Sequence, residues 1–205
     1  MLIVGFDLDM TLVDSRPGIR ASMAALTQET GVPVDVEVVI ERLGPKLEWE
    51  LAQWFPAEQV AHACKRYRAH YWEHCVDGGT ILLPGAHAAV DTVRARDGRV
   101  LVVTAKSESL AHRCIKEVGL KADVIVGHVY GDEKRDALIS HRAAIYVGDT
   151  VTDVQSALDA SATAVGVTTG PDDETQLLAA GADVVLDSLE RFPDWLATRA
   201  RPGQE

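Results

Sequence analysis

The sequence contains little cysteine, few aromatic residues, no excess of positive charge and no long hydrophobic run. Its 205 residues include 3 cysteines, and none of them form a CxxC pair, which argues against a disulfide scaffold and favours reduced thiols. No run approaches the ~18 apolar residues of a membrane helix, and no basic segment opens the chain as in a signal peptide. We therefore expect a cytoplasmic protein.

The charge balance narrows the class of partner. The formal net charge is -11, so nucleic acid and anionic membranes would be repelled and are not expected as partners. Aromatic residues make up 5% of the chain and all hydrophobic residues 47%, which suffices for one sizeable core with a smaller insertion. The composition does not fix the oligomeric state, and we expect a monomer or a homodimer.

Apolar runs alternate with helical patterns through most of the chain. Residues 2–8 form an almost continuous apolar run, as expected of a strand buried on both faces. The other predicted strands are residues 100–103, 124–126, 143–147, 163–167 and 184–186, and the helices between them are residues 86–96, 108–118, 151–160 and 175–180. This alternation predicts an α/β fold with a doubly wound parallel sheet.

The segment after the first strand has a different character. Residues 15–77 show helical periods and no convincing strand. Pro17 suits the first turn of a helix, Gly31 suits a helix end, and Pro56 opens a second long helix. Both joints of the segment lie close to the end of the first strand, so we expect the segment to form a lid over that end of the sheet.

These patterns predict two domains. The α/β core would comprise residues 1–14 and 84–205, and an inserted all-helical cap domain would comprise residues 15–83. The last residues, 198–205, are expected to be a frayed tail.

Two pairs of aspartates stand where predicted strands end. Asp7 and Asp9 follow the first strand, and Asp149 and Asp153 follow the strand at 143–147. The carboxyl ends of parallel strands meet at one edge of a sheet, and carboxylates gathered there would repel by about 4 kcal/mol per close pair at an effective dielectric constant near 20. A hard divalent cation, Mg²⁺ by preference, would offset this repulsion and commonly meets a substrate phosphate.

The first pair of aspartates suits phosphoryl transfer. Asp7 can attack phosphorus and form an aspartyl-phosphate. Asp9, two positions later, lies on the same side of an extended chain and can protonate the departing oxygen. Once the alcohol has left, Asp9 can activate the water that hydrolyses the intermediate.

Hydroxyl and ammonium groups elsewhere can bind the transferred phosphoryl group. Thr11 lies in the turn after the first strand, and Thr104 ends the second. Lys134 offers an ammonium to neutralise the charge on phosphate. Lys106 and Arg135 are alternatives for that role.

Four segments in order resemble the motifs of the haloacid dehalogenase superfamily, and in particular its phosphoglycolate-phosphatase-like branch. They are FDLDMTLVDS, VVTAKSE, GDEKRDAL and YVGDTVTDVQSALDASATAVGVTTG. Four motifs in order are more specific than any one alone, and the similarity extends from residue 2 to about residue 196. The residues that the resemblance implies are the nucleophile Asp7, the acid and base Asp9, the phosphate anchors Thr104 and Lys134, and the Mg²⁺ ligands Asp7, the Asp9 carbonyl and Asp149, with Asp153 in support.

The sequence departs from the family pattern in two places. Met10 stands where the family often has glycine, so we expect a turn that does not depend on glycine and a Met10 side chain that can reach the cleft. Lys134 precedes Asp149 by only 15 positions, which predicts a shortened helix between them.

Three basic residues of the predicted cap are candidates for substrate specificity. Arg20 and Arg42 could equally be solvated surface residues. Lys46 belongs to the segment Gly44-Pro45-Lys46, which resembles the loop that this family lowers toward its substrate.

The sequence therefore predicts a Mg²⁺-dependent phosphatase that hydrolyses a small phosphate monoester through an aspartyl-phosphate. The substrate would be a small phosphorylated metabolite: a phosphoglycolate-like compound, a sugar phosphate or a nucleotide. One alternative is a phosphosugar mutase, because Asp9 suits that chemistry equally well. Another is a non-enzymatic phospho-acceptor module resembling a response-regulator receiver, although a cap would hinder its partner. Dehalogenation would leave Asp9 without a role.

Overall fold

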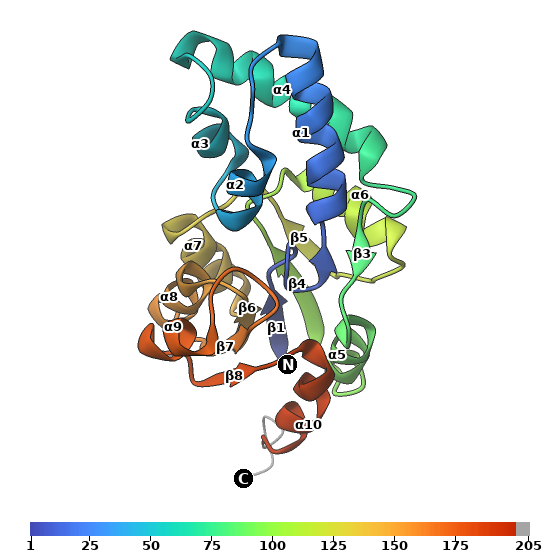
Figure 1. Cartoon of the computed structure of the whole chain (residues 1–205). Coiled ribbons are helices and arrows are strands. Elements are labelled where there is room, and N and C mark those ends of the chain that lie inside the picture. The colour runs from blue at the N-terminus through green and yellow to red at the C-terminus, as the bar shows by residue number, and fades with distance from the viewer. Residues whose placement is uncertain (200–205) are drawn as a thin grey trace.

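Six parallel strands form the central sheet of the computed structural model, which describes residues 1–199 (Figure 1). In sheet order they are β5 (Val124–Val126), β4 (Arg99–Val103), β1 (Ile3–Phe6), β6 (Ile145–Gly148), β7 (Thr163–Val167) and β8 (Val184–Leu186). The chain winds outward from β1 in one direction and then from β6 in the other. Doubly wound sheets bind ligands at such a reversal, outside the carboxyl ends of the strands. The predicted α/β fold with a parallel sheet is confirmed.

Side chains alternate between the two faces of the sheet and bury a core on each. On β4, Val100 and Val102 belong to one apolar cluster, whereas Leu101 and Val103 belong to the other, as the two-residue period of a strand requires. Helices α5 (Ala86–Arg94), α6 (Glu108–Glu117) and α10 (Phe192–Ala197) cover the first face, and α7 (Asp132–His141), α8 (Val151–Asp159) and α9 (Glu174–Ala179) cover the second (Figure 1).

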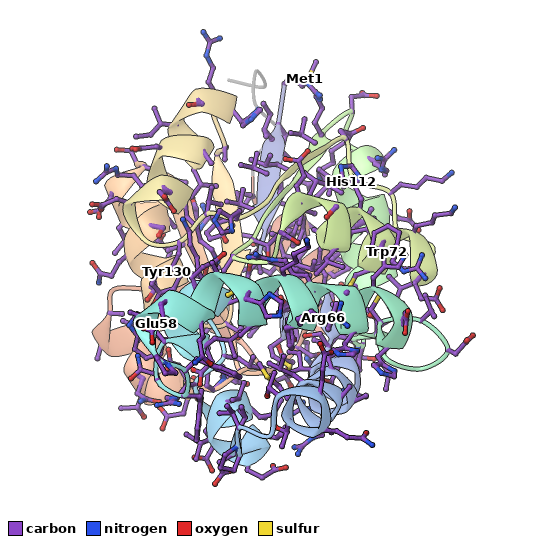
Figure 2. The ribbon with its side chains drawn as sticks, turned by 90° about the horizontal axis from the view of Figure 1, so that it is seen from above. Met1, Glu58, Arg66, Trp72, His112 and Tyr130 are labelled. Carbon is purple, nitrogen blue, oxygen red and sulfur yellow. The ribbon has the colours of Figure 1, made fainter. Side chains whose placement is uncertain are left out.

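The residues between β1 and α5 form the helical part above the sheet. It consists of α1 (Arg16–Thr30), α2 (Val36–Glu41), α3 (Leu47–Leu51) and α4 (Ala57–His74). Pro17 lies in the first turn of α1, and Gly31 ends that helix at a φ of 73°, as the sequence predicted. Seen from above, α4 crosses the molecule from Glu58 to Trp72, with His112 of α6 near the Trp72 end (Figure 2).

A short ribbon joins this helical part to the sheet. β2 (Val13–Asp14) pairs with β3 (Ile81–Leu82) in antiparallel fashion, with Val13 opposite Leu82. Both passages of the chain between the two parts run through this ribbon. We retain a core of residues 1–14 and 84–205 and a cap of residues 15–83 as a proposed division, supported by the position of the ribbon at its joints.

Some local expectations need refinement. α7 keeps ten residues, and only three residues separate it from β6, so the short spacing between Lys134 and Asp149 falls on the connection and not on the helix. The sequence did not predict α2, α3, α10 or the 3₁₀ turn at Leu189–Arg191. It also did not predict β2 and β3, and β3 lies inside the segment expected to be all-helical, because a strand of two residues is too short to show an alternating pattern. Of the expected tail, residues 200–205 lie outside the described residues.

Two further features of the described residues concern the cysteines and the length of the helices. Cys64, Cys75 and Cys114 are buried and free. Across residues 1–199, none of the helices has both the length and the apolar character needed to cross a bilayer.

Candidate active site

Three neighbouring strands deliver the central polar residues of the site. Asp7 follows β1, Thr104 follows β4 and Asp149 follows β6, and β1 lies between the other two strands. The backbone N–H of Asp7 donates to the carbonyl of Val147 at 2.8 Å, which joins the residue after β1 to the end of β6. Asp7, Thr104 and Asp149 are all buried, and a carboxylate oxygen from each of Asp7, Asp149 and Asp153 lies within 4.8 Å of the others.

Burial of these carboxylates disfavours their negative charge. Desolvation raises the pKa of Asp7 to about 7, although the nearby Lys134 acts in the opposite direction. Desolvation, followed by repulsion from Asp7, raises the pKa of Asp149 well above its usual range. The Thr11 hydroxyl donates to Asp149 Oδ1 at 2.6 Å. Thr11 is therefore turned toward a carboxylate, where the sequence analysis had expected it to face the phosphoryl group.

Lys134 is the buried cation among the aspartates. Its Nζ lies 3.0 Å from Asp7 Oδ1 and 2.6 Å from Asp153 Oδ1. Desolvation opposes its charge, but attraction to Asp153 and Asp7 raises the pKa of Lys134 well above the usual value. A protonated Lys134 thus stands beside the expected nucleophile, in a position to meet a phosphate bound there.

Both oxygens of Asp153 already have partners. Oδ1 accepts from Lys134 and, at 3.1 Å, from the Tyr146 hydroxyl. Oδ2 accepts from the backbone N–H of Thr150 at 3.2 Å and from its hydroxyl at 2.6 Å. With its oxygens occupied in this way, Asp153 is suited to hold Lys134 in place and less suited to bind a metal ion directly.

Several residues that support the site were not predicted from the sequence. Gly5 leaves room for Tyr146, because a Cβ at Gly5 would lie 2.9 Å from the Tyr146 ring. Gly170 lies against Asp149 so closely that a Cβ there would fall 1.8 Å from Asp149 Oδ2. Neither contact has a sequence signal, since each joins distant segments. The Thr150–Asp153 capping box of α8 does have one, a threonine three residues before a carboxylate.

A second lysine, Lys106, lies beside Asp9, the other expected catalytic residue. Lys106 Nζ is 3.0 Å from Asp9 Oδ1, and the Lys106 side chain is only 8% exposed. Lys106 and Lys134 therefore occupy different places, with Lys134 beside Asp7. Arg135, the other alternative, pairs with Asp132 and Asp136 on the outside of α7.

Met10 differs from what the sequence suggested. Its φ is 60°, so the turn does adopt the left-handed conformation that glycine favours. The side chain is 3% exposed and lines a separate hollow with Ile40, Leu43 and Gly170, whereas the lining of the main pocket does not include it. The expectation that Met10 reaches the catalytic cleft is not supported.

The main pocket lies between the sheet edge and the helical part above it. It has an empty volume of about 850 Å³, part of it open to solvent, and Asp7, Asp9, Thr104 and Asp149 lie at its floor. Its upper wall is largely apolar and includes Ile19, Met23, Val39, Leu43, Tyr67 and Tyr71.

The three basic residues expected to set specificity have different positions. Arg42 lines the pocket, and its Nη2 lies 2.8 Å from Oε1 of the buried Glu50. Arg20 pairs with Glu37 and does not belong to the pocket lining. Lys46 Nζ lies 2.5 Å from Glu133 Oε2 on α7, so Lys46 connects the helical part to the core.

The donor set fits a hard divalent cation. Asp7 and Asp149 are two oxygen donors whose pKa values are raised first by burial and then by nearby carboxylates, Asp153 and Asp9 for Asp7, and Asp7 and Asp153 for Asp149, so the ionised pair lacks full compensation. Mg²⁺ prefers such carboxylate oxygens. The absence of a side chain at Gly170 lets the Asp149 carboxylate pack against the backbone there, because a Cβ would lie 1.8 Å from Asp149 Oδ2.

The fold and this arrangement of carboxylates define a hydrolase of the haloacid dehalogenase type. The chain matches the model of the haloacid dehalogenase-like hydrolases over residues 4–167 and belongs to that family. It is similar to the phosphoglycolate phosphatases of Rhodospirillum rubrum (30% identity; 93% of this chain and 89% of that protein covered) and Chromobacterium violaceum (28%; 93% and 94%). A hydrolase from Pseudomonas syringae shares the fold with a TM-score of 0.79 at 22% identity, covering 98% of this chain and 100% of the other.

These comparisons bear out the family and the enzyme class predicted from the sequence. The chain is an enzyme of the haloacid dehalogenase-type phosphatase class.

Proposed function

We propose that the protein is a Mg²⁺-dependent phosphatase that hydrolyses a small phosphate monoester through an aspartyl-phosphate on Asp7. The observation that carries this proposal is the position of Asp7, buried at the end of β1 between Lys134 and Asp149 and facing the pocket. The curated relatives that are named phosphoglycolate phosphatase support the same class of reaction.

The reaction would proceed in two steps at Asp7. In the first, a carboxylate oxygen of Asp7 forms a bond to phosphorus while the ester P–O bond breaks, and Asp9 gives its proton to the departing oxygen. In the second, Asp9 takes a proton from water, and the water oxygen attacks phosphorus and releases inorganic phosphate and Asp7. Lys134 and Thr104 would hold the phosphoryl oxygens in both steps.

Asp7, the Asp9 carbonyl and Asp149 would hold the Mg²⁺ ion, with Asp153 in support through Lys134. When bound, Mg²⁺ neutralises charge on the phosphoryl group and orients it. Thr11 would fix the Asp149 carboxylate through its 2.6 Å hydrogen bond.

The pocket favours a compact substrate. The candidates are a phosphoglycolate-like acid, a sugar phosphate and a nucleotide. Of the three basic cap candidates, Arg42 is the one that lines the pocket and could contact the leaving group. Of the other two basic candidates, Lys46 would act through the position of the cap, and Arg20 has no contact with the pocket. The three free cysteines suit the reducing cytoplasm.

The test is hydrolysis of p-nitrophenyl phosphate and of a panel of metabolite monoesters. We expect turnover with Mg²⁺, none with EDTA, and a loss of more than about 1000-fold in kcat for Asp7→Asn, because the nucleophile is removed. Asp91→Asn, on the exposed side of α5, is the matched control. Retained turnover in Asp7→Asn would remove Asp7 as nucleophile.

The products distinguish the alternatives. Free inorganic phosphate supports the phosphatase. An isomerised sugar phosphate would indicate a mutase, and a long-lived aspartyl-phosphate without turnover of free monoesters would indicate a receiver-like module.

A further inference from the structure

Lys106 lies between an expected catalytic residue of the core and an aromatic residue of the cap. Its Nζ is 3.0 Å from Asp9 Oδ1 and 4.3 Å from the centroid of the Tyr71 ring. Lys134 meets Asp7 and Asp153 instead. Lys106 therefore has contacts that the proposed phosphate-binding groups do not share.

The cap fixes the position of the Tyr71 ring. Tyr71 lies on α4, is 1% exposed and stacks on Tyr67 with ring centroids 5.9 Å apart. The same helix reaches α6 of the core, where the Arg113 guanidinium lies 4.4 Å from the centroid of the Trp72 ring (Figure 2). The ring above Lys106 is therefore present only when α4 rests on the core.

We propose that Lys106 is a positioning residue that holds Asp9 in place for proton transfer only while the cap is closed. This inference rests on the proposed function. When Asp9 carries its proton, Oδ1 accepts from the Lys106 ammonium as the carbonyl oxygen. The proton then lies on the other oxygen, which is available to the leaving group.

Burial gives this contact its strength. A cation over an aromatic face is held more strongly when water is excluded, and a hydrogen bond from an ammonium to a carboxyl oxygen strengthens as the surrounding dielectric falls. If α4 lifts away, the ring leaves and Lys106 becomes hydrated on a flexible stem, so its restraint on Asp9 weakens. The proton donor is thus placed at the same time as water is excluded from the pocket.

Substrates whose leaving groups differ in basicity can distinguish positioning of Asp9 by Lys106 from a purely structural role of Lys106. p-Nitrophenolate leaves readily without a proton, whereas phenolate depends more on protonation by Asp9. We measure single-turnover release of p-nitrophenol and of phenol from p-nitrophenyl phosphate and phenyl phosphate. In Lys106→Met we expect the rate with phenyl phosphate to fall about 100-fold and that with p-nitrophenyl phosphate less than about tenfold.

Other variants test the geometry. Lys106→Arg keeps the charge and is expected to recover part of the phenyl phosphate rate. Tyr71→Leu lacks the ring face and is expected to show the same selective loss of the phenyl phosphate rate as Lys106→Met, but a smaller one. Tyr71→Phe keeps the ring face and is expected to lose less of that rate than Tyr71→Leu. Lys121→Met, at an exposed lysine in the loop after α6, is the control and leaves both rates unchanged.

Two outcomes overturn the inference, and they differ. Equal loss on both substrates in Lys106→Met, with circular dichroism and thermal unfolding like the wild type, would show that Lys106 does not act through Asp9. Wild-type protein inactive on both substrates would instead refute the proposed function. If Lys106→Met does not fold, Lys106→Gln is measured in the same way and judged by the same ratio.

Discussion

The aspartates of the site differ in how many of their carboxylate oxygens already accept hydrogen bonds. Asp153 has partners on both oxygens, from Lys134, Tyr146 and Thr150. Asp149 Oδ1 accepts a hydrogen bond from Thr11, and Oδ2 packs against the backbone of Gly170. Although the carboxylates lie close together, their hydrogen bonds favour a supporting role for Asp153 and a ligand role for Asp149.

Met10 allows a prediction about stability. Its φ of 60° is left-handed, which costs a residue with a Cβ about 1–2 kcal/mol. Met10→Ala loses the buried side chain and keeps the strain, whereas Met10→Gly loses the side chain and the strain together. We expect the glycine variant to have a higher free energy of unfolding than the alanine variant by about 1 kcal/mol, as measured by urea denaturation.

An exposed position inside a helix provides the comparison. At His112 on α6 the order should reverse, with alanine more stable than glycine by about 1 kcal/mol. If alanine is also the more stable residue at position 10, the strain argument is wrong.

The sequence predicted the positions of Asp7, Asp9, Thr104 and Asp149 because each follows an apolar run, and strand ends of a parallel sheet converge. It named Lys134 as the phosphate anchor but left Lys106 and Arg135 open as alternatives. That choice depends on contacts across 97 and 127 positions, to Asp9 and Asp7 respectively, which no local pattern encodes. The hydrogen bond from Tyr146 to Asp153 could not be predicted either, because the Tyr146 ring needs the space beside Gly5, which is distant in the sequence.

At the scale of elements, strongly periodic segments were predicted and irregular ones were not. β1, β4 and β6 are buried on both faces and read as apolar runs. α2 and α3 have six and five residues, too few to show a helical period. α7 buries Lys134 beside Ala137 and Leu138, so a charged residue occupies its inner face and masks the pattern.

The contact between Lys46 and Glu133 predicts a change in cap position. The pair joins the start of α3 to α7, and its side chains are 23% and 53% exposed, so it contributes at most about 1 kcal/mol. Lys46→Glu places like charges together and favours an open cap. We expect kcat/KM to fall about fivefold with little change in melting temperature, and the loss to shrink in high salt.

The reversed pair is the control for this contact. Adding Glu133→Lys to Lys46→Glu restores opposite charges and should recover most of kcat/KM. A double variant as impaired as Lys46→Glu alone would show that Lys46 acts on the substrate directly.

At the scale of the whole molecule, the buried carboxylates link stability to pH. In metal-free protein the pKa of Asp7 rises from 3.8 to about 7, so the folded state holds this proton more tightly than the unfolded state. The free energy of unfolding should therefore fall as pH rises from about 4 to 7, by up to about 4 kcal/mol from this group. Denaturation in EDTA at several pH values measures the slope.

Asp7→Asn isolates the contribution of that carboxyl, because every other charge remains. Its stability should depend less steeply on pH than that of the wild type over the same window, and Mg²⁺ should flatten the wild-type slope by favouring the ionised form. Equal slopes for wild type and Asp7→Asn in EDTA would contradict the assignment.

The ribbon of β2 and β3 restricts how the helical cap can move relative to the sheet. The two crossings are hydrogen-bonded to each other, with Val13 opposite Leu82 and the N–H of Leu83 donating to the carbonyl of Leu12 at 3.0 Å. Paired strands resist sliding past one another but twist and bend as a unit. A bend or twist of this ribbon would therefore move the cap as one body, and reversal of that movement would bring Tyr71 back over Lys106.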